Sequence, residues 1–254
     1  MTPPPPPSKR DDADEPVSRA GAALGRLSDW LELRSFAKWV ALSAVVGVLG
    51  GLAAVLFSVS VEFAKEVGFG RVAGTTQGGL MRGANPALVL AFPALGGLLV
   101  GLLIHFAGTE RDGAGTDAVI RAFHRMKGRV RRRVSWGTGL ASTRTIGSGG
   151  AGGQEGPIAQ IGASIGSTLA RVLDFSDRDR RLFLMAGGSA GVGAMFASPL
   201  GGALFLPEVM YRRAEFEGDG IIPCVVSSSV AFATFDAILG REHAILLPAA
   251  VLDS

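Results

Sequence analysis

The chain has little cysteine, little histidine and little charge. Its 254 residues include one cysteine, Cys224, so no disulfide can form within the chain. The three histidines are scattered without the close spacing of metal ligands, and we expect neither a metal nor a cofactor. Charged residues make up 19% of the sequence, against roughly 25% in ordinary soluble proteins.

Charge is absent altogether from three long segments. These are Trp39–Val61, Gly83–Thr109, in which His105 is formally neutral, and Leu182–Pro207. Each is longer than the roughly 20 residues that cross the hydrocarbon core of a bilayer as a helix. A shorter apolar segment covers Gly220–Phe235. The sequence therefore predicts an all-α, multi-pass protein of the cell membrane, with the lipid bilayer as its surroundings.

Acidic residues are missing from one strongly basic stretch. Its seven basic residues are Arg121, Arg125, Lys127, Arg129, Arg131, Arg132 and Arg133. A nucleic-acid partner would need a soluble basic domain around such a cluster, and apolar segments flank this one, so we expect no nucleic acid. A short basic loop between membrane helices is instead typical of the cytoplasmic side. We expect the N-terminus on the same side.

Polar residues dominate the first 28 positions, which include the five consecutive prolines Pro3–Pro7. A segment of this composition cannot bury a hydrophobic core. We therefore predict two parts, a disordered polar tail over 1–28 and a membrane domain over 29–254.

Apolar periodicity, caps and prolines predict a series of helices in the second part. We expect them at about 28–38 (interfacial), 38–67, 86–107, a short one ending near 124, 135–146, 156–173, one opened by a Ser176–Asp179 capping box and crossing 182–196, one from the Ser198-Pro199 break to about 211, and 219–239. Several are too short to span a bilayer or are broken by glycine and proline. Unwound backbone at membrane depth survives only where it lines a cavity or is buried in protein, so we predict broken and re-entrant helices.

Glycine is abundant, with 37 residues where average usage gives about 18. It recurs at four-residue spacing in Gly47/Gly51, Gly97/Gly101, Gly162/Gly166 and Gly187/Gly191. Small residues at this spacing let the backbones of membrane helices approach closely. The four pairs therefore predict close helix crossings.

One carboxylate, Glu155, lies in the glycine-rich segment Gly147–Pro157, and no other charge lies between Arg144 and Arg171. An ionisable group inside a membrane is costly and marks a functional site. Glycines before a helix start leave backbone N–H groups free to face an anion. The segment thus predicts an anion-binding cradle that contains a titratable carboxylate. The alternative is a structural carboxylate paired with an arginine such as Arg144.

Three segments carry a resemblance to a known family. They are Gly113–Asp117 (GAGTD), Gly153–Gly162 (GQEGPIAQIG) and Phe196–Val209 (FASPLGGALFLPEV). In order, spacing and membrane context they resemble the CLC family of voltage-gated chloride channels and chloride/proton antiporters. The resemblance covers about Leu31 to Ser254 and implies the first half of a CLC-type inverted repeat.

The resemblance also implies roles for individual residues. Glu155 matches the gating glutamate, whose carboxylate occupies an anion site and swings away when it is protonated or displaced. The implied anion-binding residues are Gly113, Ala114, Gly115, Thr116, Gln154, Gly156 and Pro157. Glu208 and Val209 match the positions beside the family's proton path.

Four positions depart from the family pattern. Ala114 replaces the usual serine, so a hydroxyl ligand to the anion is missing, and Gln154 stands where many relatives have arginine. Asp117 replaces the proline of the first segment, and we expect it to cap the short helix that follows. Val209 replaces the second glutamate of proton-coupled relatives, which favours passive conduction.

We therefore expect transport of chloride or a similar monovalent anion rather than enzymatic catalysis. Chloride/proton antiport stays open, because Glu208 is adjacent to the missing acid and other antiporters also lack it. The family's second half is missing from the chain, so we expect a fragment of a longer homodimeric protein, and a truncated half that does not transport also stays open. A dinucleotide-binding enzyme would explain the GxGxxG pattern of Gly147–Gly152, but that motif needs a soluble βαβ unit.

Overall fold

The computed structural model describes residues 19–70, 75–76, 79–80, 86–107, 115–150, 152–211 and 220–240. Residues 1–18 of the predicted tail lie outside this description. Helix α1 (Arg19–Ala64) begins inside the segment predicted as tail, and the predicted interfacial helix over 28–38 is part of α1. Tertiary contacts divide the chain into two units, of which the first ends at Trp39 and the second begins at Val40. All elements after α1 belong to the second unit.

The described residues of the second unit are almost entirely helical. After α1 come a π-helical turn, η1 (Lys65–Gly70), two short antiparallel strands, β1 (Thr75–Thr76) and β2 (Gly79–Leu80), and helix α3 (Pro86–Ala107). The helices that follow are α4 (Thr116–Arg125), α5 (Arg132–Gly147), α6 (Glu155–Val172), α7 (Asp177–Met195), α8 (Pro199–Met210) and α9 (Ile221–Leu239). The all-α prediction is confirmed, and the predicted helices from 86 onward agree with these bounds to within a few residues.

Two helices begin at serine caps, of which the sequence predicts the one at Ser176. The Ser176 hydroxyl accepts a hydrogen bond from the Asp179 N–H at 3.2 Å, which opens α7. The Ser198 hydroxyl accepts one from the Gly201 N–H at 3.3 Å, and Pro199 is the first residue of α8. A proline is favourable at that position because its missing N–H would have had no partner within the helix.

The predicted cap of α4 is wrong. Gly115 occupies the N-cap position, and Asp117 lies inside the first turn, where its side chain makes no capping hydrogen bond. An N-cap must precede the first helical residue. Here the helix already begins at Thr116, so Asp117 comes too late to cap it.

Helices α6 and α7 cross with their backbones in contact. A Cβ atom at Gly162 of α6 would collide with the carbonyl oxygen of Gly187 of α7, and one at Gly191 would lie 2.6 Å from the carbonyl oxygen of Ile158. Gly47 of α1 meets α9 in the same way. The predicted close crossings at these pairs are confirmed. Around Gly97 and Gly101 of α3, in contrast, nothing in the described chain lies within 4 Å of an added Cβ.

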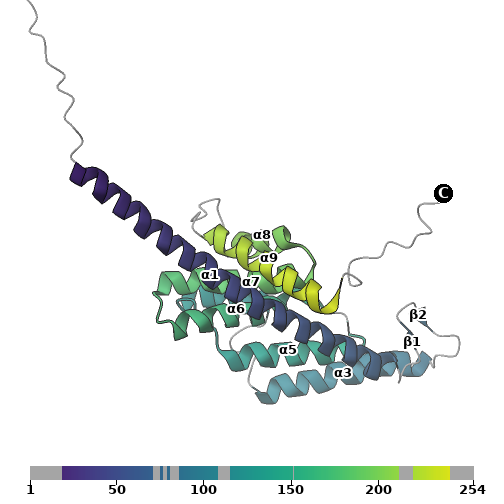
Figure 1. The fold of residues 1–254 in the computed structure, drawn as a ribbon. Helices are drawn as coiled ribbons and strands as arrows, with labels where there is room; N and C mark the ends of the chain where they lie inside the picture. Colours follow the sequence, from purple (N-terminus) through teal and green to yellow (C-terminus); the bar gives the residue numbers. More distant parts are fainter. Residues whose placement is uncertain are drawn as a thin grey trace, which may run out of the picture. The chain divides into compact units, whose positions relative to one another are not determined.

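Helix α7 forms the centre of the second unit. Every residue from Leu182 to Ala194 is buried. Helices α6, α8 and α9 pack against it, while α4 and α5 pack against α6 and α3 packs against α5 (Figure 1). This packing explains why the charge-free segment Leu182–Pro207 needs no lipid contact along α7.

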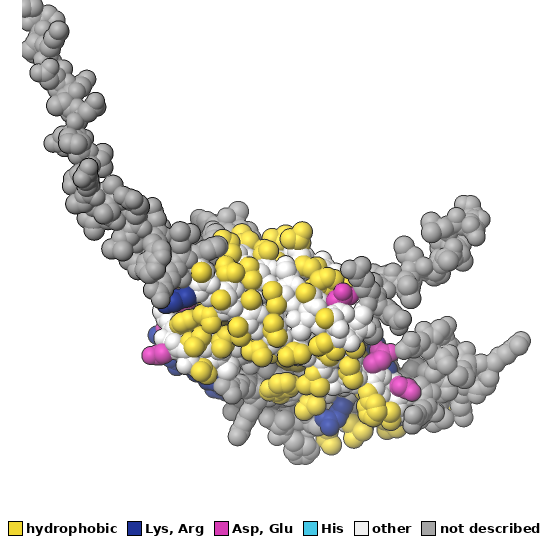
Figure 2. All heavy atoms as spheres, viewed as in Figure 1, with side chains coloured by type: hydrophobic (Ala, Val, Ile, Leu, Met, Phe, Trp, Pro, Cys, Tyr) yellow, Lys and Arg dark blue, Asp and Glu magenta, His cyan; other side chains and the backbone are white. Residues whose placement is uncertain are grey.

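Among the described residues, two helical segments are long and apolar enough to cross a membrane, Ala37–Val67 and Ile221–Leu239, and the shorter Pro93–Leu102 and Pro199–Met210 are also apolar. Large apolar side chains of α1 are exposed at Val45, Val48, Leu49, Leu52, Leu56, Val59 and Phe63. In Figure 2 apolar side chains cover the centre of the visible face and charged ones lie toward its margins. An exposed apolar surface of this kind suits a lipid environment.

Candidate functional site

The first turns of α4 and α6 meet backbone to backbone. A Cβ atom at Gly115, before α4, would lie 3.1 Å from the Gly156 Cα, and one at Gly156 would lie 3.1 Å from the Gly115 Cα. A side chain at either position would push the two helix starts apart by a few tenths of an ångström, and Gly115 also has the left-handed φ of 65° that glycine adopts readily. We call this contact the α4–α6 junction. Each helix start leaves backbone N–H groups without intrahelical partners and carries the positive end of the helix dipole.

A hydrogen bond to Gln160 of α6 stabilises the α4–α6 junction. The Gln160 side chain is fully buried, and its Oε1 accepts a hydrogen bond from the Gly115 N–H at 2.8 Å. No role for this residue could be predicted from the sequence, because its partner lies 45 positions earlier in the chain. The available signal was a lone amide side chain among the apolar and small residues that follow Glu155.

Glu155 is the first residue of α6 and is exposed. Its carboxylate folds back toward the preceding loop, where a Cβ atom at Gly153 would collide with Glu155 Oε2. Both Glu155 and Arg144 are described, and no ion pair between them occurs among the described residues. The geometry therefore offers no support for a structural pairing of these two side chains.

Of the other predicted site residues, some lie at the α4–α6 junction, some lie in α8, and two are outside the described residues. Gly113 and Ala114 lie outside the described residues. Gly115 and Thr116 lie at the start of α4, while Gln154, Gly156 and Pro157 lie at the start of α6, so the structure brings these five together. Glu208, which is exposed, and Val209 lie near the end of α8, and no described hydrogen bond or ion pair connects Glu208 to the junction.

The turn over residues 126–131 follows α4 and holds its end against α6. It carries Lys127, Arg129 and Arg131, and we call it the basic turn. The Ser167 hydroxyl of α6 donates to the Gly128 carbonyl oxygen at 2.6 Å and accepts from the Val130 N–H at 3.2 Å. Lys127 and Gly128 both have left-handed backbone, with φ of 53° and 74°. Since α4 is held at its start by Gln160 and beyond its end by Ser167, it has little freedom to move relative to α6.

An ion-pair cluster ties the same turn to α7. The buried Arg180 guanidinium donates to Asp177 Oδ1 at 2.7 Å, to the Phe175 carbonyl oxygen at 3.1 Å and to the Lys127 carbonyl oxygen at 3.4 Å. Lys127 Nζ lies 3.3 Å from Asp177 Oδ2. The hydrogen bond from Lys127, followed by that from Arg180, lowers the pKa of Asp177 below its ordinary value. The basic turn is therefore fixed in place, although most of its basic side chains are exposed.

Comparison with known proteins gives a consistent result. The family described as "Voltage gated chloride channel" matches residues 96–252. A chloride/fluoride channel protein of Pseudomonas syringae pv. tomato is 33% identical over 195 residues, which are 77% of this chain and 39% of that protein. An H(+)/Cl(-) exchange transporter of Vibrio vulnificus is 30% identical over 209 residues, which are 82% of this chain and 44% of that protein. The chain thus spans less than half the length of these relatives.

Solved structures show the same fold. The crystal structure of a CLC-type fluoride/proton antiporter has a TM-score of 0.67 with 21% sequence identity, over 84% of this chain and 50% of that one. A slow cyanobacterial Cl-/H+ antiporter has a TM-score of 0.64 with 19% identity, over 80% of this chain and 47% of that one. At these identities the likeness concerns the fold alone.

Proposed function

Because this chain belongs to the CLC family of voltage-gated chloride channels and related transporters, we propose that it forms the first half of an anion pathway gated by Glu155. The relatives include a protein named as a channel and others named as proton exchangers, so membership of the family supports anion transport without choosing between them. The α4–α6 junction is the observation that carries the proposal.

The junction has the electrostatics that an anion requires. Two helix starts meet there, and each has backbone N–H groups without intrahelical partners and the positive end of a helix dipole, both of which attract an anion. Glu155 stands at one of these starts, so its carboxylate can occupy the place of a permeant anion. An anion that displaces the carboxylate, or a proton that neutralises it, would open the path.

The hydrogen bond of Gln160 narrows the list of proposed ligands. The Gly115 N–H already donates to Gln160 Oε1, so it is not available to an anion. The Thr116 N–H and hydroxyl at the start of α4, and the backbone N–H groups of Gln154 and Gly156 at the start of α6, remain as proposed ligands. Pro157 has no N–H, so its proposed part in the site is to shape the backbone beside the anion. Gly113 and Ala114, which lie outside the described residues, stay proposed ligands from the family pattern, and the Ala114 side chain has no hydroxyl.

We propose passive conduction as the mode of transport. Val209 supplies no acid at the inner position of a two-glutamate proton relay. Proton-coupled exchange is the second candidate, because Glu208 is exposed one position earlier and several relatives are named as proton exchangers. We further propose that the complete protein is a homodimer in the cell membrane, with residues 29–254 as the first half of its membrane domain and the N-terminus in the cytoplasm. A third candidate, from outside transport, is a membrane half that does not conduct.

A paired flux assay distinguishes these candidates. The complete protein is reconstituted into liposomes, and chloride efflux and proton movement are recorded together under a chloride gradient. Passive conduction predicts chloride efflux without proton uptake against its gradient, and the same result for Glu208→Gln. Uphill proton movement that Glu208→Gln abolishes would replace conduction by antiport. Absence of any flux in a folded preparation would favour the half that does not transport.

A further inference from the structure

Positive charge is concentrated where α4 ends and where α6 continues into α7. Residues 121–131 and 171–181 contain nine arginines and lysines and three aspartates, a net charge of +6. The Ser167 hydroxyl holds the basic turn against α6, and a Cβ atom at Gly128 would lie 3.0 Å from the backbone nitrogen of Arg181 in α7. The two ranges therefore lie side by side, and we call them the basic end.

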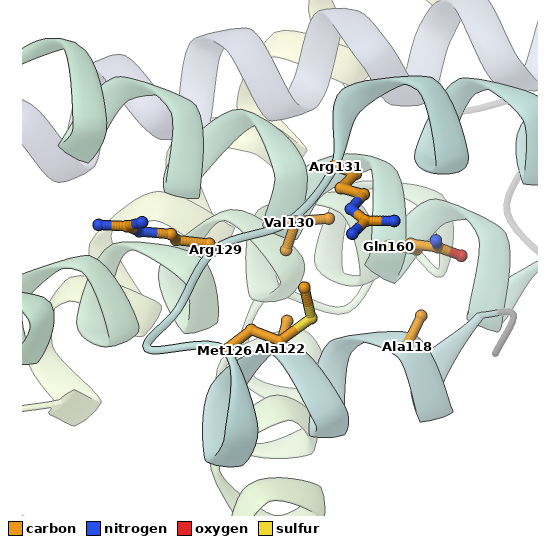
Figure 3. A pocket seen from close by; sticks show the side chains of 7 residues that line it. All are labelled: Ala118, Ala122, Met126, Arg129, Val130, Arg131 and Gln160. Carbon is orange, nitrogen blue, oxygen red and sulfur yellow. The ribbon is translucent and has the colours of Figure 1, made fainter. Parts of the chain in front are cut away.

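Two arginines of the basic end are available to a ligand from outside. Arg129 and Arg171 are exposed, and no ion pair among the described residues involves either of them. Figure 3 shows the side chain of Arg129 extending from the basic turn away from Gln160. Arg171 lies one turn beyond Ser167 on the same face of α6, which is the face that holds the basic turn. Both side chains therefore begin beside the basic turn and can reach the same ligand.

Helix α5 leads away from the basic end along α6. Val130, just before α5, donates to Ser167 near the end of α6. In the middle of α5, a Cβ atom at Gly139 would lie 2.9 Å from the Ile161 side chain, which belongs to the first half of α6. The two helices are therefore antiparallel, and the first turns of α5 lie beside the last turns of α6.

Exposed apolar side chains border the two arginines. Val172, which is 70% exposed, and Leu173 follow Arg171 directly. Trp136 and Leu140 lie one turn apart on one face of α5, close to the basic turn, and are 49% and 56% exposed. Tryptophan is enriched where a membrane protein meets the boundary between headgroups and acyl chains. The basic end thus combines cations with an apolar surface beside them.

This combination fits a phospholipid better than a soluble anion. A guanidinium binds phosphate oxygens through two parallel hydrogen bonds, so the arginines suit a phosphate group. A free phosphate would leave the apolar side chains in water, whereas a lipid covers them with its acyl chains. A lipid with net negative charge is favoured over a zwitterionic one, because basic residues near a membrane surface attract anionic lipids.

We infer that Arg129 and Arg171 bind the headgroup of an anionic phospholipid. Its acyl chains lie against Trp136, Leu140 and Val172. The site is separate from the proposed anion pathway, because the α4–α6 junction lies at the start of α6 and the basic end at its other end. The inference does not depend on transport, because lipid binding is measured without flux.

Lipid binding to the complete protein in detergent tests the inference. Phosphatidylglycerol is titrated into the protein, and bound lipid is counted by native mass spectrometry. Phosphatidylcholine with the same acyl chains, which has no net charge, is the comparison. We expect phosphatidylglycerol to bind about thirtyfold more tightly, as two arginines near an anionic lipid imply. Equal affinity for the two lipids would overturn the inference.

Glycerol 3-phosphate distinguishes a lipid site from a site for free phosphate, because it carries the phosphate without acyl chains. At a concentration equal to that of phosphatidylglycerol it should not displace the lipid. Displacement as effective as that by unlabelled phosphatidylglycerol would show a site for soluble phosphate and contradict a lipid as the ligand.

Four variants locate the bound lipid. Arg129→Gln and Arg171→Gln should each bind phosphatidylglycerol about fivefold more weakly and leave phosphatidylcholine unchanged. Trp136→Ala should weaken the binding of both lipids, because it removes apolar contact rather than charge. Arg144→Gln is the matched control, since Arg144 is also exposed but lies in the last turn of α5, away from the basic end. A loss in Arg144→Gln equal to that in the other two arginine variants, or no loss in either of those two, would contradict the site.

Discussion

Replacing Gly162 by alanine tests the close crossing of α6 and α7, on which the position of the α4–α6 junction depends. The added Cβ would collide with the Gly187 carbonyl oxygen, which is backbone and cannot turn aside as a side chain would. Overpacking of this kind costs about 3 kcal/mol, the upper end of the usual range. Alanine returns about 1 kcal/mol through its better helix propensity. We therefore expect the complete protein to lose about 2 kcal/mol of unfolding free energy.

Gly97→Ala is the matched control, because it makes the same substitution in a helix where nothing in the described chain lies within 4 Å of the new Cβ. Only the gain of about 1 kcal/mol in helix propensity remains there, so this variant should be slightly stabilised. The assay compares the thermal unfolding midpoints of the two variants and the original protein in the same detergent. Equal midpoints for the two variants, or a Gly162→Ala variant more stable than the original, would refute the reasoning.

Two further predictions concern the basic turn and the junction. Asp177→Asn removes the ion pairs with Lys127 and Arg180. These pairs lower the pKa of Asp177 from its ordinary 3.8, so the stabilisation that they give the original protein is fully present above pH 3.8 and is lost as the pH falls further. Thermal melts of this variant and the original should differ at neutral pH and converge in strong acid, and a constant difference would contradict the role of the ion pairs. Gly115→Ala lowers the free energy of unfolding by about 1–2 kcal/mol, because alanine disfavours the left-handed φ of this position. The added Cβ also pushes the starts of α4 and α6 apart, so liposome assays should show less anion transport per folded protein. Gly240→Ala has a similar φ, 72°, with open space around it, and should keep transport; an equal loss in both would remove the junction from the explanation.

Local signals in the sequence predicted most of the helices. Pro86 opens α3, Ser176 caps α7, and the Ser198-Pro199 pair separates α7 from α8, because each of these acts on neighbouring backbone. The start of α1 at Arg19 was missed, because the first 28 positions were treated as one polar tail although Ala20, Leu24 and Leu27 recur at helical spacing. Asp117 was misplaced by two positions, because an aspartate favours both the cap and the first turn of a helix.

The candidate site was predicted only in part. The cost of a charge at membrane depth singled out Glu155, and the glycine pattern indicated close packing near it. The contact of Gly115 with Gly156 and the bond of Gln160 to Gly115 join segments about 40 residues apart, so only the folded chain reveals them. The ion pair of Lys127 with Asp177 depends in the same way on a long-range approach. Gly97 and Gly101 show the converse, because their spacing predicts a crossing that the described chain does not contain.

The gate is tested most directly by chloride flux through the complete protein with Glu155→Gln, measured in liposomes across a range of pH. Glutamine has the size of the protonated side chain and carries no charge, so it cannot occupy the anion site as a carboxylate does. The proposed gate predicts that flux through the original protein rises as the pH falls, whereas flux through Glu155→Gln is high at neutral pH and independent of pH. Unchanged flux with unchanged pH dependence in the variant would show that Glu155 is not the gate.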